Sequence, residues 1–341
     1  MDNSIVFDWV SLSGHFLSMS SMFEFIGIDG SYLDGKFLPC PGRNFFDYGM
    51  CYISEGKQAI TFLYSQHNNG NDSVDSPETL GMIDLSGRGC RLFETYSKLS
   101  FLELFERIYK LDNFQVCRLD IALDIKDKDY PMSRFINAYR KHNYICAARS
   151  QSHIESRNAE LEGHSLYFGT QASDFRINIY DKRAERGFTE RELPDGWIRI
   201  EVRLRHQTAM VFLERFINGV PIGQLYFGVL TDKLRFLTPS KTDSNKHRWA
   251  TAKWWLKIIQ DNESIHLEMP GITYDFSRWE KNFWTQCGSR LKLFTSMYPN
   301  PWDLYAEINS HDIQLNSDQR FLKDNYIPGV AWYEVPRAVG S

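Results

Sequence analysis

Three segments of the chain alternate between apolar and polar residues, which is the pattern of a β-strand with one buried face. In residues 117–125, 175–182 and 198–205, large apolar side chains recur at every second position. Successive side chains of a strand point to opposite faces of a sheet, so each segment presents one apolar row and one polar row. An antiparallel sheet commonly has one face on the core and one in water. We therefore predict three antiparallel strands with a common polar face.

The polar rows of these strands carry many titratable side chains. In chain order they are Arg118, Asp120 and Asp124, then Arg176, Asn178, Tyr180 and Lys182, then Arg199, Glu201, Arg203 and Arg205. Like charges on one sheet face repel each other, so the carboxylates indicate either a solvated face or a shared cation. If the three strands are neighbours, all of these residues emerge on one surface.

This combination of side chains suits phosphodiester chemistry. A hard divalent cation such as Mg²⁺ or Mn²⁺ is held by a few carboxylates and keeps positions for water and phosphate oxygens. A tyrosine hydroxyl beside it can act as a nucleophile, with its phenolate favoured by neighbouring Arg and Lys side chains. An ordinary strand aromatic at Tyr180, and a metal nuclease that uses water, are the alternatives at this point.

Four segments follow one another as they do in the trans-acting replication initiation factor family, which this chain resembles. They are residues 117–124 (CRLDIALD), 167–173 (YFGTQAS), 176–182 (RINIYDK) and 199–205 (RIEVRLR). Residues 7–11 and 85–91 are similar to the first half of that family, so the resemblance covers residues 5–217. The family commonly has Gly-Ser-Arg where this chain has Gly169-Thr170-Gln171, so a basic residue is missing from that loop.

The resemblance implies a strand-specific DNA nickase and ligase that starts rolling-circle replication through a 5′-phosphotyrosyl link. By position in the motif, Tyr180 is the nucleophile, with Arg176 and Lys182 beside it. The metal ligands implied for Mg²⁺ or Mn²⁺ are Asp120, Asp124 and Glu201. The expected partners are double- and single-stranded origin DNA and a host helicase. The resemblance is also compatible with a homodimer.

Two other functions are compatible with much of this pattern. A relaxase of a mobile element has the same chemistry, whereas a non-catalytic DNA-binding regulator would not need Tyr180 together with three carboxylates. Relaxases of this family often carry an N-terminal helix-turn-helix module. The strand pattern here begins within ten residues of Met1, which favours an initiator.

The formal net charge of −4 is an objection to DNA binding, because phosphate contacts require Lys and Arg. The cations are unevenly distributed, however, since residues 233–257 contain seven Lys and Arg residues against one Asp, interleaved with tryptophans. A solvated helix is the alternative for this segment. We predict DNA contacts at Arg199 and Arg203 on the sheet, and at Lys246, Arg248 and Lys253 in the basic segment.

The distribution of strand and helix patterns predicts an α+β protein. We expect residues 1–217 to form an antiparallel-sheet nicking domain of two ferredoxin/RRM-like half-units, with helices near 99–111 and 131–142. Residues 218–341 are expected to form a smaller, mostly helical module. DNA recognition is a candidate role for this module.

Composition excludes several other classes. No apolar run reaches the ~20 residues that span a bilayer, and the N-terminus lacks the basic start of a secretory signal. We therefore expect a cytoplasmic protein with no membrane partner and with six reduced cysteines. His153 and His164 fall between the acidic strand and the tyrosine strand and could approach the metal, although lone histidines are more often surface or capping groups.

Overall fold

The computed structural model describes residues 3–29, 37–43, 46–54, 56–65, 79–158, 161–186, 196–259, 272–298, 300–311, 320, 323 and 332–335. The chain divides into two compact units, Met1–Leu267 and Glu268–Ser341. The candidate site residues all lie in the first unit.

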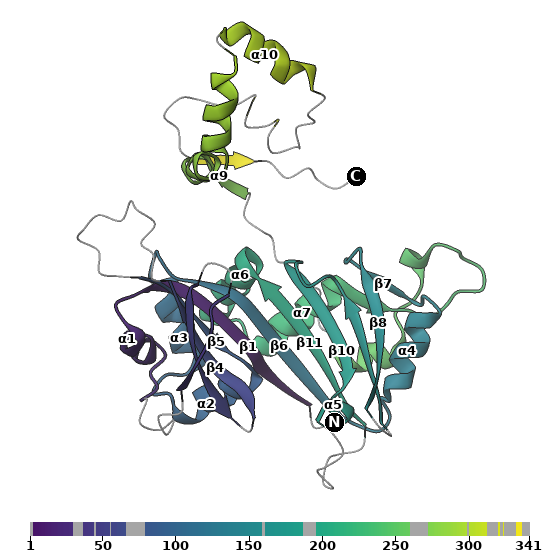
Figure 1. The fold of residues 1–341 in the computed structure, drawn as a ribbon. Coiled ribbons are helices and arrows are strands. Elements are labelled where there is room, and N and C mark those ends of the chain that lie inside the picture. The colour runs from purple at the N-terminus through teal and green to yellow at the C-terminus, as the bar shows by residue number, and fades with distance from the viewer. Residues whose placement is uncertain are drawn as a thin grey trace. The chain divides into compact units, whose positions relative to one another are not determined.

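A ten-stranded antiparallel sheet forms the first unit, in the spatial order β2-β3-β4-β5-β1-β6-β11-β10-β9-β8 (Figure 1). The strands are β1 (Asn3–Phe16), β2 (Phe37–Pro41), β3 (Tyr48–Ser54), β4 (Lys57–Tyr64), β5 (Thr79–Leu85), β6 (Gln115–Lys126), β8 (Gln151–Asn158), β9 (Leu161–Phe168), β10 (Phe175–Asp181) and β11 (Trp197–Arg205). A separate two-stranded sheet pairs β7 (Tyr144–Cys146) with β12 (Leu234–Phe236).

The large sheet consists of two halves with the same topology. The first half has the order β2-β3-β4-β5-β1 and the second β8-β9-β10-β11-β6, so the halves join where β1 pairs with β6. In each half one helix follows the first strand and another follows the last: α1 (Met19–Phe25) and α2 (Gly87–Tyr96), then α4 (Met132–Arg140) and α6 (His206–Ile217). The predicted α+β class is confirmed, and this repeat of the topology gives the predicted half-units a structural basis.

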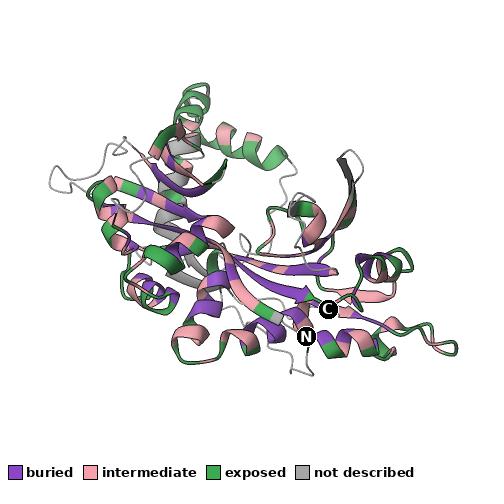
Figure 2. Cartoon of the chain, turned by 90° about the horizontal axis from the view of Figure 1, so that it is seen from below, coloured by how far each residue is buried: buried purple, intermediate pink, exposed green. Residues whose placement is uncertain are grey.

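Helices cover the apolar face of the sheet. Besides those named, they are α3 (Phe101–Tyr109), α7 (Ile222–Lys233) and α8 (Lys253–Ile259), and Figure 1 shows α6 and α7 behind the strands. The apolar rows of β6 and β11 are buried against them, from Leu119 to Ile125 and from Ile198 to Leu204. Figure 2 shows this burial along the strands and on the inner sides of the helices. The polar rows consequently share the other face.

The unit boundary differs from the predicted one between 217 and 218. Helix α7 buries Leu225 through Leu230 almost completely, and the Tyr226 hydroxyl donates a 2.8 Å hydrogen bond to the carbonyl of Ile200 in β11. A helix that is apolar nearly all round is buried on every side. Helices α7 and α8 are therefore part of the sheet unit, and the second unit begins at Glu268.

The second unit contains a small two-stranded sheet and two helices among its described residues. Strand β13 (Ile272–Asp275) pairs with β14 (Trp332–Val335), and the helices are α9 (Phe276–Ser296) and α10 (Pro301–Ser310). Across the described residues of both units, none of the helices combines the length and apolar character required to cross a membrane.

Candidate active site

The pairing of three strands brings the predicted site residues onto one surface. Strand β11 lies between β6 and β10, with Glu201 opposite Ala122 in β6 and opposite Asn178 in β10. Arg199 lies opposite both Asp124 and Tyr180. Paired residues point to the same face of a sheet, so the predicted common polar face is confirmed.

Tyr180 is at the centre of a short hydrogen-bond chain. It is 8% exposed, and its hydroxyl donates to Oε1 of Glu201 at 2.6 Å. Nζ of Lys182 donates to the Tyr180 hydroxyl oxygen at 3.2 Å and also pairs with Glu185 at 2.9 Å. Burial, followed by the negative charge of Glu201, raises the pKa of Tyr180 well above its usual value. The tyrosine is therefore protonated at neutral pH and needs a base to become a nucleophile.

Glu201 has the properties of such a base. Burial, and then the negative charge of Asp8, raise the pKa of Glu201 to about 7, although the Tyr180 hydrogen bond acts in the opposite direction. A carboxylate with a pKa near neutrality combines a substantial ionised population with a useful affinity for a proton.

Asp8 is a member of the site that the sequence patterns did not single out. It lies in β1 at an irregularity of the β1–β6 pairing between Phe7 and Trp9, where one extra residue interrupts the alternation. Its carboxylate accepts a 2.5 Å contact from Nη1 of Arg199. The missed signal was the acidic residue that directly follows Phe7: Phe7 is buried in the core, so the next side chain of the strand points to the polar face.

The other two predicted carboxylates are buried and bound by arginines. Oxygens of Asp120 accept hydrogen bonds from Arg118 at 2.5 and 2.9 Å and from Arg203 at 3.1 Å. Asp124 accepts from Nε and Nη2 of Arg199 at 2.8 and 2.6 Å and from the Trp197 indole at 2.9 Å. Burial alone would raise the pKa of Asp124, but the bonds and charge of Arg199 lower it.

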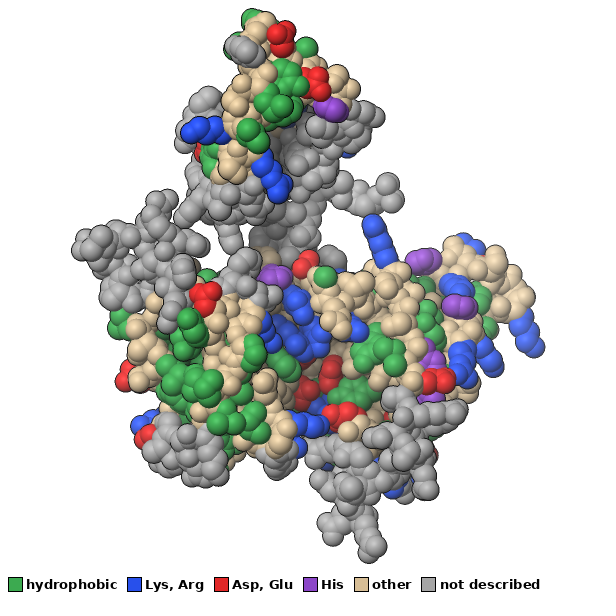
Figure 3. Space-filling view, in the orientation of Figure 1, with side chains coloured by type: hydrophobic (Ala, Val, Ile, Leu, Met, Phe, Trp, Pro, Cys, Tyr) green, Lys and Arg blue, Asp and Glu red, His purple; other side chains and the backbone are tan. Residues whose placement is uncertain are grey.

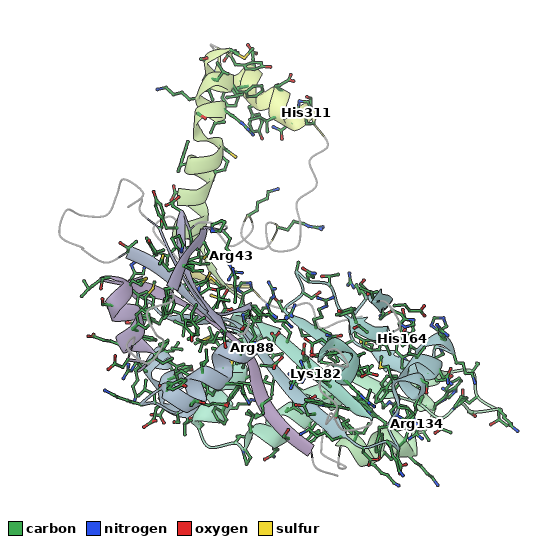
Figure 4. The ribbon with its side chains drawn as sticks, turned by 60° about the horizontal axis from the view of Figure 1, so that its bottom comes forward. Arg43, Arg88, Arg134, His164, Lys182 and His311 are labelled. Atoms are coloured by element: carbon green, nitrogen blue, oxygen red, sulfur yellow. The ribbon has the colours of Figure 1, made fainter. Side chains whose placement is uncertain are left out.

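A cleft of about 770 Å³ lies over this cluster. Its described lining includes Asp8, Asp120, Tyr180 and Glu201, but Asp124 is not part of it. Cationic side chains from β4 and α2 also line the cleft, namely Lys57, Arg88 and Arg91. Figure 3 shows Lys and Arg side chains beside Asp and Glu side chains near the middle of this face, and Figure 4 locates Arg88 and Lys182 near the centre of the sheet.

A row of arginines continues along the same face from the cleft. It comprises Arg118 on β6, Arg176 on β10, and Arg203 and Arg205 on β11. The guanidinium of Arg176 lies 4.1 Å from the ring centroid of Tyr167, and that of Arg118 lies 4.0 Å from Trp9. The buried Nε groups of Arg176 and Arg205 have no hydrogen-bond partner among the described residues. Burial, and then the charge of Arg203, lower the pKa of both side chains. This row is suited to an anion.

The two histidines lie on the other face of the sheet. In β9, Ser165 faces Tyr180, so its neighbour His164 points away from the tyrosine. His153 in β8 pairs with Leu166 on that same apolar face and packs against Tyr139 of α4. Neither histidine joins the Tyr180 cluster, and Figure 4 shows His164 well apart from Lys182.

Two cations of the basic segment are engaged in hydrogen bonds within the first unit. Arg248 forms two hydrogen bonds to Asp243, at 2.6 and 2.9 Å, and Nζ of Lys246 donates to the His142 carbonyl at 2.7 Å. Lys253 is the first residue of α8. Trp255 is completely buried in the core, so the interleaved aromatic pattern reflects packing there.

The fold and the polar face define a protein with a tyrosine–carboxylate centre next to an arginine-rich surface. The replication initiation factor family matches residues 114–306, which is more than half of the chain. The chain belongs to this family, as its motifs predicted.

Two relatives illustrate the family. The putative DNA relaxase NicK of Bacillus subtilis (strain 168) is 26% identical over 195 residues, which is 53% of this chain and 53% of NicK. The match thus spans about half the length of that curated relative. The solved structure of a rolling circle replication initiator protein from Geobacillus stearothermophilus matches with a TM-score of 0.63 and 24% identity, covering 78% of this chain and 99% of that chain. This second likeness shows a common fold.

Proposed function

We propose that this protein is a rolling-circle replication initiator that nicks and rejoins one DNA strand through Tyr180. The observation that carries the proposal is the contact of the Tyr180 hydroxyl with Glu201 at 2.6 Å and with Lys182 at 3.2 Å. The family membership and the fold likeness to an initiator support it. The second candidate function is a relaxase of a mobile element, which uses the same chemistry during DNA transfer. The relaxase relative supports this candidate.

The proposed reaction is a transesterification. Glu201 takes the Tyr180 proton as the phenolic oxygen attacks the phosphorus, and the bond from phosphorus to the 3′ oxygen breaks. The 3′ oxygen leaves, takes a proton and becomes a 3′ hydroxyl, while the 5′ phosphate is attached to Tyr180. Lys182 stabilises the negative charge on the phenolic oxygen. Attack by a 3′ hydroxyl on the phosphotyrosine reverses these steps and rejoins the strand.

A divalent cation, Mg²⁺ or Mn²⁺, fits beside this pair. Negative charge on Asp8 and Asp120 helps to raise the pKa of Glu201, so the three carboxylates repel one another across the cleft they line. A cation there would relieve this repulsion and stabilise charge on the phosphate oxygens. Asp120 also holds two arginines, so it contributes to such a site chiefly by its charge. We propose Asp8 as a ligand in place of Asp124: Asp8 lines the cleft and gives only Oδ1 to Arg199, whereas Asp124 does not line the cleft and has both oxygens bound by Arg199.

The proposed DNA path follows the arginine row and the basic wall of the cleft. Guanidinium groups bind phosphates with strong, charge-assisted hydrogen bonds. Arg203 belongs to this row, whereas Arg199 is 6% exposed and bound by two carboxylates, which makes it a positioning residue. We further propose that Lys246, Arg248 and Lys253 of the basic segment contact DNA as a second binding region.

A denaturing-gel assay tests the proposed function directly. An oligonucleotide labelled on the 5′ side or on the 3′ side of the nick is incubated with the full chain and Mn²⁺. We expect the label downstream of the nick to migrate with the protein and the upstream fragment to carry a free 3′ hydroxyl. Cleavage with no label on the protein would favour a metal nuclease that uses water.

We expect the nicking rate to rise with pH through a midpoint of about 7. Glu201 must be ionised to accept the Tyr180 proton, and its raised pKa keeps most of it protonated about one unit below that value. More Mn²⁺ should move the midpoint to lower pH, because a bound cation favours the carboxylate. Single-turnover cleavage across pH at several Mn²⁺ concentrations measures both effects. A rising limb at the ordinary carboxyl pKa, unaffected by Mn²⁺, would remove Glu201 from this role.

We expect the double substitution Arg176→Gln and Arg205→Gln to weaken single-stranded DNA binding and to flatten its dependence on salt. Each lost phosphate contact should reduce the slope of log K against log salt by about 0.7. Fluorescence anisotropy over a salt series measures this slope. Lys110→Gln, at the end of α3 on the helix side, is the matched control and should leave the slope unchanged.

A triple variant decides between the two proposed DNA-binding regions. It replaces the three basic-segment residues with glutamine: Lys246, Arg248 and Lys253. If only this variant changes the salt slope, the sheet face is not the main contact surface. If only the Arg176 and Arg205 variant changes it, the basic segment is a solvated surface.

A further inference from the structure

A second group of potential metal ligands lies on the opposite face of the sheet from Tyr180. His153 and Glu155 occupy alternate positions of β8, so their side chains share a face. His164 of β9 is directly opposite Glu155 in the β8–β9 register. One ligand atom of each residue lies within 4.8 Å of the others. Two neighbouring strands thus present three ligands of the types that bind transition metals.

The two imidazoles are separated by the distance that a shared tetrahedral ion requires. Nε2 of His153 lies 3.3 Å from Nδ1 of His164. Zinc–nitrogen bonds of 2.0–2.1 Å at a tetrahedral angle place two ligand nitrogens about 3.3–3.4 Å apart. The Glu155 side chain is about half exposed, with a fractional exposure of 47%, so it can adjust to complete the set.

The surroundings favour the neutral form of His153. Its side chain is 11% exposed and packs against Tyr139 of α4. The charged and titratable groups near it are Glu155, His164 and Arg140. Burial lowers the pKa of His153, with smaller lowering from His164 and Arg140, and Glu155 opposes them. A neutral imidazole offers a lone pair to a cation.

Arg140 of α4 orients the carboxylate from outside the group. Its Nη2 donates to Oε1 of Glu155 at 2.7 Å. Ligating carboxylates are commonly held by such outer hydrogen bonds, which fix their direction. The guanidinium also sets a condition, because a bound divalent ion has to be favoured over the existing Arg140–Glu155 ion pair.

We propose that His153, Glu155 and His164 form a binding site for Zn²⁺ or a similar transition metal, with water as the fourth ligand. The site is distinct from the carboxylate cluster at Tyr180 and does not depend on the nicking reaction. It links β8 to β9 at the edge of the ten-stranded sheet. A metal that connects two strands there would stabilise the edge hairpin, whose outer strand β8 pairs only with β9 among the described strands.

Cobalt binding to the chelator-treated full chain tests the site. We expect one Co²⁺ per chain to give the visible absorption of a tetrahedral nitrogen–oxygen site, and one equivalent of Zn²⁺ to displace it. The variants His153→Ala and His164→Ala should each lose this band. Glu201→Gln should keep it, which separates the site from the metal proposed at Tyr180.

His311→Ala is the matched control. His311 forms a 3.3 Å contact with Glu307 in the second unit, and among the described residues this pair belongs to no group of three potential metal ligands. This variant should retain the Co²⁺ band. Because alanine variants can fail to fold, the wild-type chain is also followed by long-range ¹H–¹⁵N NMR of its imidazoles during Zn²⁺ addition. Absence of the band, or imidazole resonances of His153 and His164 unmoved by Zn²⁺, would overturn the proposal.

Discussion

Replacing Tyr180 with Phe should abolish the covalent protein–DNA adduct and lower strand cleavage by roughly 10⁴-fold or more, the scale seen when a covalent enzyme loses its nucleophile. Phenylalanine keeps the ring in its buried position but removes the oxygen that contacts Glu201 and Lys182. The substitution should therefore change chemistry with little effect on folding. The denaturing-gel assay measures the adduct, and thermal unfolding of the variant verifies its stability.

Tyr167→Phe is the matched control for this experiment. Tyr167 lies on the same face, opposite Asn178 of β10, and its ring packs under the Arg176 guanidinium. Its hydroxyl is expected to be dispensable for the adduct. An adduct that persists in Tyr180→Phe and disappears in Tyr167→Phe would move the nucleophile to Tyr167. Cleavage that persists without any adduct would favour a water-using nuclease.

Replacing Arg199 with Met should destabilise the protein by about 3–5 kcal/mol, the cost of leaving a buried charge without its partner. The guanidinium makes two hydrogen bonds to Asp124 and one to Asp8, and both Arg199 and Asp124 are more than nine-tenths buried. Methionine removes all three bonds and leaves Asp124 with the Trp197 indole as a donor. Urea unfolding followed by tryptophan fluorescence measures the change in free energy.

Two comparisons make this stability prediction specific. Arg248→Met removes an exposed arginine that forms a similar two-bond contact with Asp243, and solvent-exposed pairs of this kind contribute little. The double variant Arg199→Met, Asp124→Leu removes both buried charges and should recover part of the lost stability. Equal losses in Arg199→Met and Arg248→Met, or no recovery in the double variant, would contradict a buried ion pair.

The alternation of side chains along single strands determined the polar face of this protein. Tyr180, Glu201 and Asp120 could be assigned to one surface from the sequence, because side-chain direction in a strand is set by local backbone geometry. The motif order in residues 117–205 was also sufficient to predict the family, which the comparison confirms.

The tertiary structure decided which acidic residues face the cleft. Asp120 and Asp124 are equivalent in the strand pattern, yet strand pairing puts Arg199 opposite Asp124 and closes it off with two guanidinium bonds. In β1, Asp8 reaches the polar face directly after the inward Phe7, and the irregularity there turns Trp9 to the same face, which depends on the pairing of β1 with β6 more than one hundred residues away. Long-range register of this kind leaves no periodic signal in the chain.

Packing likewise decided the extent of the sheet unit and the separate location of the histidines. The residues of α7 were assigned to the C-terminal module from the sequence, and only the burial of this helix against β11 shows that it belongs to the first unit. His153 and His164 precede the tyrosine strand in sequence and could have joined its site. The strand register instead places Ser165 opposite Tyr180, so His164, one position earlier, points to the opposite face, as does His153. The sequence by itself determined the strands around the site, their polar rows and the family, because these follow from local periodicity and motif order. The partners of each charged side chain were decided by the tertiary structure, because desolvation and pairing depend on residues that meet only after folding.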